Sequence, residues 1–218
     1  MSSMKLHLLN AHGALTEHRN FLERCLESTY QKAMARLKLP ALDVVVKLGA
    51  QVIPEKGHLG YCPEPGVVYI IVDPENPAFC RNTHQSLERM FAHELHHAAR
   101  WTGPGYGVTL GEAIVSEGLA GHFALEIFGG EPEPWEVLSV NEIHPYHVML
   151  ADNWKCKNYD HNAWFYGTGL LPRWLGYSLA FNLIADYFQA HPDQSASRLV
   201  LVDAEEFQAS QPNLDFPW

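Results

Sequence analysis

Apolar residues recur at helical spacing along most of the chain. Between residues 16 and 37 they fall three or four positions apart, which predicts a helix that Pro40 ends. The same pattern predicts a helix that begins after residue 82 and runs to about Arg100, and another from just after Thr109 to about Phe128. Later helices are expected over residues 171–190 and 195–208. The chain is therefore mostly helical.

Short β-branched runs predict strands at residues 43–48 and 67–73, on either side of a Gly/Pro-rich stretch at 54–66. Residues 74–81 are expected to form a loop, followed by Asn82 and Gln85 at the spacing of a helix-capping box. Residues 131–160 are rich in Pro, Trp, Asn and Asp, and are expected to be irregular. These patterns predict an α+β fold with a small sheet ahead of the helix that ends near Arg100. We expect one domain over residues 1–218, in three parts: 1–82, 83–130 and 131–218.

Charge and cysteine content exclude several classes of function. The 15 Lys and Arg residues are outnumbered by 25 Asp and Glu, and a net charge of −10 leaves no basic stripe for nucleic acid or an anionic membrane. The four cysteines are too far apart for a C-x-x-C motif and too few for a stapled secreted scaffold, so we expect reduced thiols. The apolar stretches are too short to span a bilayer. We therefore expect a cytoplasmic protein.

Histidine is abundant, with 13 residues, and three of them lie in the segment His93-Glu94-Leu95-His96-His97. In this H-E-x-x-H pattern the two outer histidines are one helical turn apart on the same face, so both imidazoles can bind one Zn²⁺. Glu94 is rotated by about 100° from His93, which places its carboxylate beside the metal as a proton acceptor for water. One helix face is expected to be core and the His93 face to be free for metal. Core positions are Leu87, Phe91, Leu95 and Ala98, and Met90, His97 and Arg100 share the face of His93.

A catalytic zinc needs a third protein ligand, and Glu112 and Glu117 both follow the motif. They are about 140° apart around a helix, so only one can point at the metal. Glu112 fits a capping box with Thr109. Glu117 has no such explanation, and its face carries small side chains that allow a close approach to the metal helix. We therefore choose Glu117. The small residues are Ala113, Ala120, Gly121 and Ala124.

Four other residues compete for metal-binding roles. His96 is rotated by about −60° from His93 and is expected in the outer shell or at the surface, and His122 is about 140° from Glu117 and should face elsewhere. Cys62 and Cys80 flank the second strand and can pair or bind metal, although buried thiols are the simpler interpretation.

The motif His93-Glu94-x-x-His97 followed by Ser116-Glu117-Gly118-Leu119-Ala120 resembles the gluzincin arrangement, in which two helices supply His, His and Glu to a peptidase zinc. The order of elements and the segment Pro172-Arg173-Trp174-Leu175-Gly176-Tyr177 resemble the YjaZ-like bacterial family of predicted zinc-dependent proteases. Ala180 departs from the family's pattern, where a second glycine is expected. The resemblance implies a zincin-like fold and peptidase activity on a peptide or protein substrate.

A peptidase also needs a donor that stabilises the oxyanion. Tyr177 and Tyr166 are the candidates, followed by His144, His147 and His161; packing and surface roles are the alternatives. An aromatic-rich stretch, Trp154 to Tyr166, is expected either to line a pocket or to belong to the core. Substrate is expected to pair with a sheet edge that the sequence does not identify.

Two other functional classes remain open. One is a zinc-stabilised scaffold or binding protein, in which a fourth ligand such as His144 or His147 closes the coordination sphere. The other is a zinc hydrolase that acts on a small molecule. A scaffold has no use for a carboxylate at Glu94.

Overall fold

The computed structural model describes residues 3–208, which divide into two compact units. The first holds the described residues up to Gly103 together with residues 124–130, and the second holds residues 104–123 and the described residues from Glu131 onward. Helix α4 (Leu110–Phe128) contributes residues to both units.

The first unit is built on a four-stranded sheet with the order β1-β2-β4-β3. Strands β1 (Met4–Leu9), β2 (Leu42–Leu48) and β4 (Val67–Val72) are parallel, and β3 (His58–Glu64) is antiparallel to β4. One face of the sheet is apolar and buried, because Val44, Val46, Val68 and Ile70 alternate with more exposed positions. Strand β3 forms one edge of this sheet.

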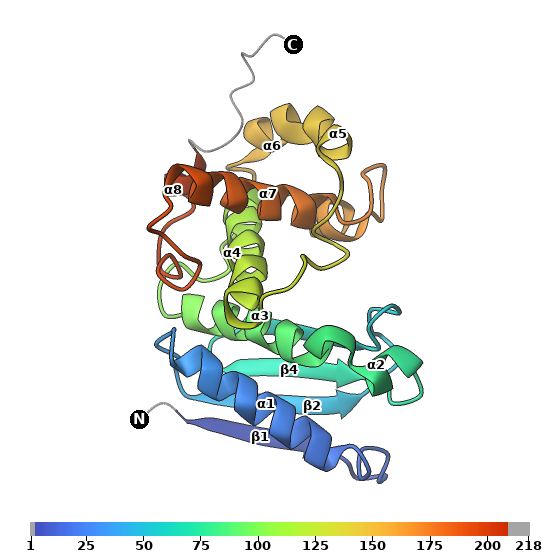
Figure 1. The fold of residues 1–218 in the computed structure, drawn as a ribbon. Coiled ribbons are helices and arrows are strands. Elements are labelled where there is room, and N and C mark those ends of the chain that lie inside the picture. The colour runs from blue at the N-terminus through green and yellow to red at the C-terminus, as the bar shows by residue number, and fades with distance from the viewer. Residues whose placement is uncertain (1–2, 209–218) are drawn as a thin grey trace. The chain divides into compact units, whose positions relative to one another are not determined.

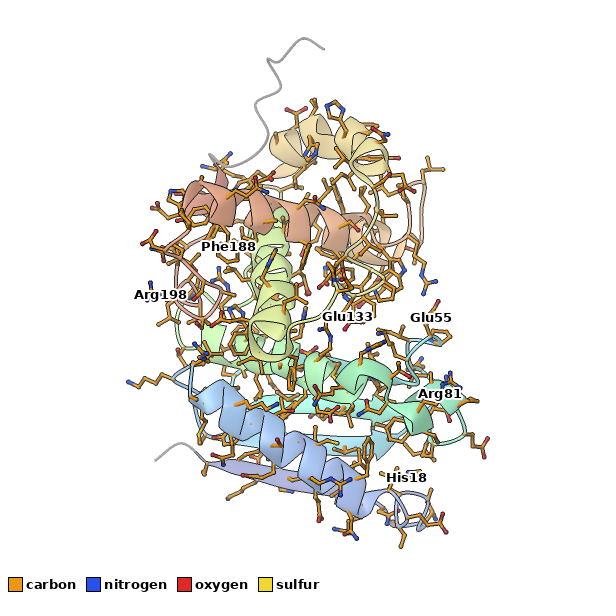
Figure 2. All side chains as sticks on the ribbon, viewed as in Figure 1. His18, Glu55, Arg81, Glu133, Phe188 and Arg198 are labelled. Atoms are coloured by element: carbon orange, nitrogen blue, oxygen red, sulfur yellow. The ribbon has the colours of Figure 1, made fainter. Side chains whose placement is uncertain are left out.

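Two helices lie side by side on that apolar face, α1 (Arg19–Met34) and α3 (Ser86–Arg100) (Figure 1). Helix α1 buries Leu22, Leu26 and Ala33, as its spacing predicts. His18, at the start of α1 (Figure 2), and Phe21 both make edge contacts with Phe79 of the short helix α2 (Pro77–Arg81). The sheet therefore has a layer of helices on one face, which fixes the position of α3.

The sequence predicted two of the four strands. Strand β3 lies inside the Gly/Pro-rich stretch 54–66, where Gly60 and Pro63 hide the strand pattern. An edge strand tolerates both residues because only one of its sides is hydrogen-bonded to the sheet. Strand β1 was also missed, although Met4, Leu6 and Leu8 alternate with exposed residues. The loop expected at residues 74–81 contains helix α2.

The second unit is helical. Its main elements are most of α4 and helix α7 (Leu175–Ala190), with the shorter helices α5 (Val140–Ile143), α6 (His147–Asn153) and α8 (Glu205–Gln208) and the helical turns η2 (His144–Tyr146) and η3 (Asn162–Tyr166). Residues 131–160, expected to be irregular, thus contain helices. Helix α7 starts four residues later than expected, and the helix expected over 195–208 is reduced to α8. The overall α+β class is confirmed. Among the described residues, no helix has the length and apolar character needed to cross a bilayer.

Helices α4 and α7 pack closely at Gly118. A Cβ at this position would lie 2.7 Å from Ile184 Cγ1 and 2.8 Å from the backbone carbon of Ala180, nearer than side chains approach one another. One turn further on, His122 stacks on Phe181, with ring centroids 4.0 Å apart, and meets the edge of Phe188 (Figure 2). The His122 ring nitrogen Nε2 is 2.9 Å from the Phe181 carbonyl. His122 therefore serves the α4–α7 contact, as expected of a residue that faces away from Glu117.

The packing at Gly118 predicts the sign of a stability change. Helix propensity alone favours Gly118→Ala by about 1 kcal/mol. Because the methyl group would collide with the α7 backbone, we expect a net loss of about 1–3 kcal/mol in urea unfolding. Gly169→Ala is the control, since its Cβ would make only an ordinary contact of 3.6 Å. A gain in stability for Gly118→Ala would contradict the close helix contact.

Candidate metal centre

Helix α3 begins after an unusual turn. Asn82, His84 and Gln85 all have positive φ, and the capping box expected between Asn82 and Gln85 is absent. Instead, Asn82 Oδ1 accepts from the Leu87 N–H at 2.9 Å and its amide donates to Glu88 at 2.7 Å. Asn82 therefore caps the helix start through a different pair of partners.

The two ends of α3 are tied to strand β3. Near the start, the ring of His58 lies 2.9 Å from the Ser86 hydroxyl. Just past the end, the Trp101 indole donates to the carbonyl of Cys62 at 3.1 Å. The helix that carries the histidines is thus held parallel to the edge of the sheet, and this fixes where its side chains point.

His93 and His97 face each other across one turn of α3. Their Nε2 atoms are 3.0 Å apart, and the rings are inclined by 76°. Two nitrogens that bind one tetrahedral zinc at 2.0–2.1 Å lie about 3.3 Å from each other. The observed separation fits that requirement, so the pair can hold a metal without rearrangement of the helix.

Glu94 lies against strand β3. A Cβ added at Gly60 would be 2.7 Å from Glu94 Cγ and 3.1 Å from Glu94 Oε1, and would collide with the Met90 sulfur. Only glycine permits this approach. Glu94 is 6% exposed, so its carboxylate is held between the metal helix and the edge strand. The helix face of Met90, His97 and Arg100, expected to be open, is buried, and His96 is also buried rather than at the surface.

The start of α4 confirms the capping role of Glu112. Its Oε2 accepts from the Val108 and Thr109 N–H groups, each at 2.8 Å, while the Glu112 N–H donates to the Thr109 hydroxyl at 3.3 Å. Partial burial works against ionisation, but these hydrogen bonds outweigh it and lower the pKa of Glu112. Glu112 is therefore explained by the helix start.

Glu117 is buried on α4 and accepts a hydrogen bond from Tyr106, whose hydroxyl lies 2.8 Å from Glu117 Oε1. Burial raises the pKa of Tyr106 well above its usual value, and the charge of Glu117 adds to the effect. Tyr106 was not among the residues predicted from the sequence. Its setting between Pro104-Gly105 and Gly107, in the loop before α4, was the available signal. The face of small residues on α4 is partly explained otherwise, because Gly121 packs against Glu136.

His93, His97 and Glu117 form a group that can hold a metal ion. Each offers one ligand atom, and the three atoms all lie within 4.8 Å of one another. Two imidazoles and one carboxylate are a ligand set that zinc accepts in catalytic sites, with a further position for water. These three residues are the ones that the sequence analysis selected.

Tyrosine and histidine side chains gather near Glu117 within the second unit. His161 stacks on Phe165, with ring centroids 4.5 Å apart. It also makes an edge contact with Tyr106, with ring centroids 6.1 Å apart. The Tyr159 hydroxyl is 3.4 Å from His161 Nδ1. Burial raises the pKa of Tyr159 to about 12, and the charge of Glu117 contributes. The expected pocket stretch therefore supplies both core residues, such as Phe165, and polar groups near Glu117.

The two tyrosines expected to stabilise an oxyanion are neighbours. The hydroxyls of Tyr177 and Tyr166 are 3.5 Å apart, and Tyr166 is 41% exposed. The other histidine candidates, His144 and His147, form a separate pair with ring centroids 5.9 Å apart. No catalytic role of these residues is tested by the geometry, and Tyr177 and Tyr166 stay predictions.

The cysteines follow the expectation of reduced thiols: all four are free. Cys62 is buried, and burial raises the pKa of its thiol, with the charge of Glu94 adding to the effect. Cys80 is exposed, so the expectation of a buried thiol is wrong there. Its position in the short surface helix α2 explains the exposure.

Two histidines of one helix, the half-buried His93 and the buried His97, define with Glu117 a candidate metal site. The chain belongs to the family described as "Predicted Zn-dependent protease (DUF2268)", whose model matches residues 22–209. It is similar to the uncharacterized protein YjaZ of Bacillus subtilis (strain 168), with 30% identity over 135 residues, 56% of this chain and 49% of that protein. It is also similar to the uncharacterized protein YjfC of the same organism, with 33% identity over 85 residues, 37% of this chain and 27% of that protein. The matches thus span about half and about a quarter of these relatives.

The site geometry predicts different outcomes for the two glutamates of α4. We expect the wild-type chain to hold about one zinc per chain. The variants Glu117→Ala and His97→Ala should each lose this zinc, because the two remaining ligands bind it too weakly. Glu112→Ala should keep the zinc and lose about 1 kcal/mol of stability through the lost cap. Elemental analysis after gel filtration and urea unfolding provide the two measurements. Full zinc content in Glu117→Ala would place the third ligand elsewhere.

Proposed function

We propose that this protein is a zinc-dependent peptidase of the gluzincin type, with His93, His97 and Glu117 as metal ligands and Glu94 as general base. The proposal rests on the grouping of three ligand atoms within 4.8 Å, two of them from histidines of the helix that also carries the buried Glu94. The family description is consistent with it. The proposed substrate is a peptide or protein.

Zinc bound at this site would lower the pKa of a water molecule toward about 7 and polarise the scissile carbonyl. Glu94 takes a proton from the attacking water as its oxygen adds to the carbonyl carbon. When the C–N bond breaks, Glu94 returns that proton to the leaving nitrogen, so one water is consumed and an acid and an amine are formed. The packing of Glu94 against Gly60 restricts the position of the carboxylate, which both proton transfers require.

The edge strand β3 is the proposed substrate platform. Its His58 carbonyl already accepts from the Ile53 N–H on the outer side, and Cys62 presents its carbonyl to Trp101. Backbone groups of an antiparallel strand alternate in direction, so the N–H and C=O of Gly60, midway between them, point to the same outer side. A peptide that pairs with Gly60 would lie next to Glu94. The substrate would thus be bound as an added strand.

Tyr177, Tyr166 and His161 are the proposed donors to the oxyanion. Tyr177 and Tyr166 contact one another, and His161 lies beside Tyr106, the partner of Glu117. A tyrosine or histidine donor in such a position is typically worth about 2.7–4 kcal/mol of transition-state stabilisation.

The general-base role is tested by Glu94→Gln. The amide keeps the size of the side chain but cannot accept the proton, so we expect peptide cleavage to fall by about 10²–10⁴-fold. Cleavage is followed by mass spectrometry on a mixed peptide library. Zinc content should be unchanged. Undiminished cleavage would remove Glu94 from the mechanism, and no peptide cleavage by the zinc-loaded wild-type protein would favour a scaffold or a small-molecule hydrolase.

The position of the base is tested at Gly60. A methyl group there would displace the Glu94 carboxylate and Met90, so Gly60→Ala should lower the rate of cleavage by about tenfold or more. Zinc content should be unchanged because the atoms nearest the added methyl belong to Met90 and Glu94 and not to the proposed ligands. Leu59→Ala, one residue away on the other face of the strand, is the control. Equal activity of wild type and Gly60→Ala would contradict the role of this contact.

A further inference from the structure

The backbone of the loop that precedes α4 is constrained on both sides of Tyr106. Gly105 and Gly107 have φ values of +72° and +91°, a region that favours glycine, and they flank Tyr106. A Cβ at Gly107 would collide with the Glu112 side chain, which also accepts the N–H groups of the next two residues. The capping glutamate thus fixes the backbone that directly follows Tyr106.

The hydroxyl of Tyr106 is hydrogen-bonded to Glu117, the proposed metal ligand. The hydroxyl lies 2.8 Å from Glu117 Oε1, and in a contact between a phenol and a carboxylate the phenol O–H is the group with a proton to donate. It therefore donates, and the carboxylate accepts. A donor on one oxygen fixes the plane of the carboxylate and favours metal binding through the other oxygen, as hydrogen-bond partners of zinc ligands do in known sites.

We propose that Tyr106 is a positioning residue for Glu117, which sets the affinity of the site for zinc and keeps Glu117 a one-oxygen ligand. This inference rests on the proposed metal site. It adds to that site a residue outside the motif and a reason for the glycine-flanked loop. A carboxylate held to one oxygen also leaves a coordination position for water, as hydrolysis requires.

The test compares the zinc affinity of Tyr106→Phe with that of wild type by competition with a chelator. The variant lacks only the hydroxyl, and we expect zinc to bind about 10- to 100-fold more weakly. Tyr187→Phe is the control: this tyrosine of α7 contacts His191 and Phe207. Thermal unfolding of the metal-free proteins verifies that both variants fold. Wild-type affinity in Tyr106→Phe would overturn the proposal.

Two further measurements separate positioning from a general structural role. In a double-mutant cycle of zinc affinities, measured by titration up to high zinc concentration because Glu117→Ala binds weakly, Tyr106→Phe should not lower the affinity of Glu117→Ala any further, because it acts through that side chain. With Co²⁺ in place of zinc, the visible absorption of Tyr106→Phe should weaken as Glu117 binds through both oxygens. An equal cost in both backgrounds, or an unchanged Co²⁺ spectrum, would overturn the proposal.

If Tyr106→Phe does not fold, Tyr106→His, which retains a ring N–H donor, takes its place. It should bind zinc more weakly than wild type and more tightly than Tyr106→Ala, and equal affinities of the two variants would count against a donor at this position. The failure of the metal site itself looks different. If Glu117→Ala binds zinc as wild type does, the ligand assignment is wrong, whatever Tyr106→Phe shows.

Discussion

The spacing of one helical turn between His93 and His97 is the constraint on which the rest of the site depends. It brings two imidazole nitrogens to 3.0 Å, close to the separation that a tetrahedral metal requires, and does so without any loop. The helix must then be held rigidly, because the spacing orients the ligands only relative to each other. The contacts of α3 with β3 through His58, Ser86, Trp101 and Cys62 supply that rigidity.

Burial of three ionisable side chains, Glu94, His97 and Glu117, imposes a second constraint, because a buried charge is costly unless it has partners. The structure meets this cost locally. Tyr106 donates a hydrogen bond to Glu117, and the tight packing of Glu94 against Gly60 restricts the orientation of that carboxylate. Pairing and tight packing of this kind fix side chains in one orientation, which is what a site for metal-assisted hydrolysis needs. The residues around the ligands therefore matter to the proposed function as much as the ligands do.

The sequence predicted the parts of the site that follow from local periodicity. The helix of His93 and His97, the capping role of Glu112 and the grouping of Glu117 with the two histidines all rest on positions within a few turns of helix. The missed parts depend on long-range pairing: β3 is a strand only because β4 lies beside it, and Tyr106 matters only because its loop folds back on Glu117. The expectation of an open helix face failed for the same reason, since a helix wheel records which residues share a face and cannot show what packs on it.

The proposed function requires that His93, His97 and Glu117 bind one zinc ion. The most direct test is an anomalous-scattering map of zinc-loaded crystals, recorded on both sides of the zinc absorption edge. We expect one strong peak about 2.0–2.2 Å from both histidine nitrogens and from a Glu117 oxygen, with a water as a further ligand. A peak bound elsewhere, or a peak at His93 and His97 whose third protein ligand is a residue other than Glu117, would contradict it.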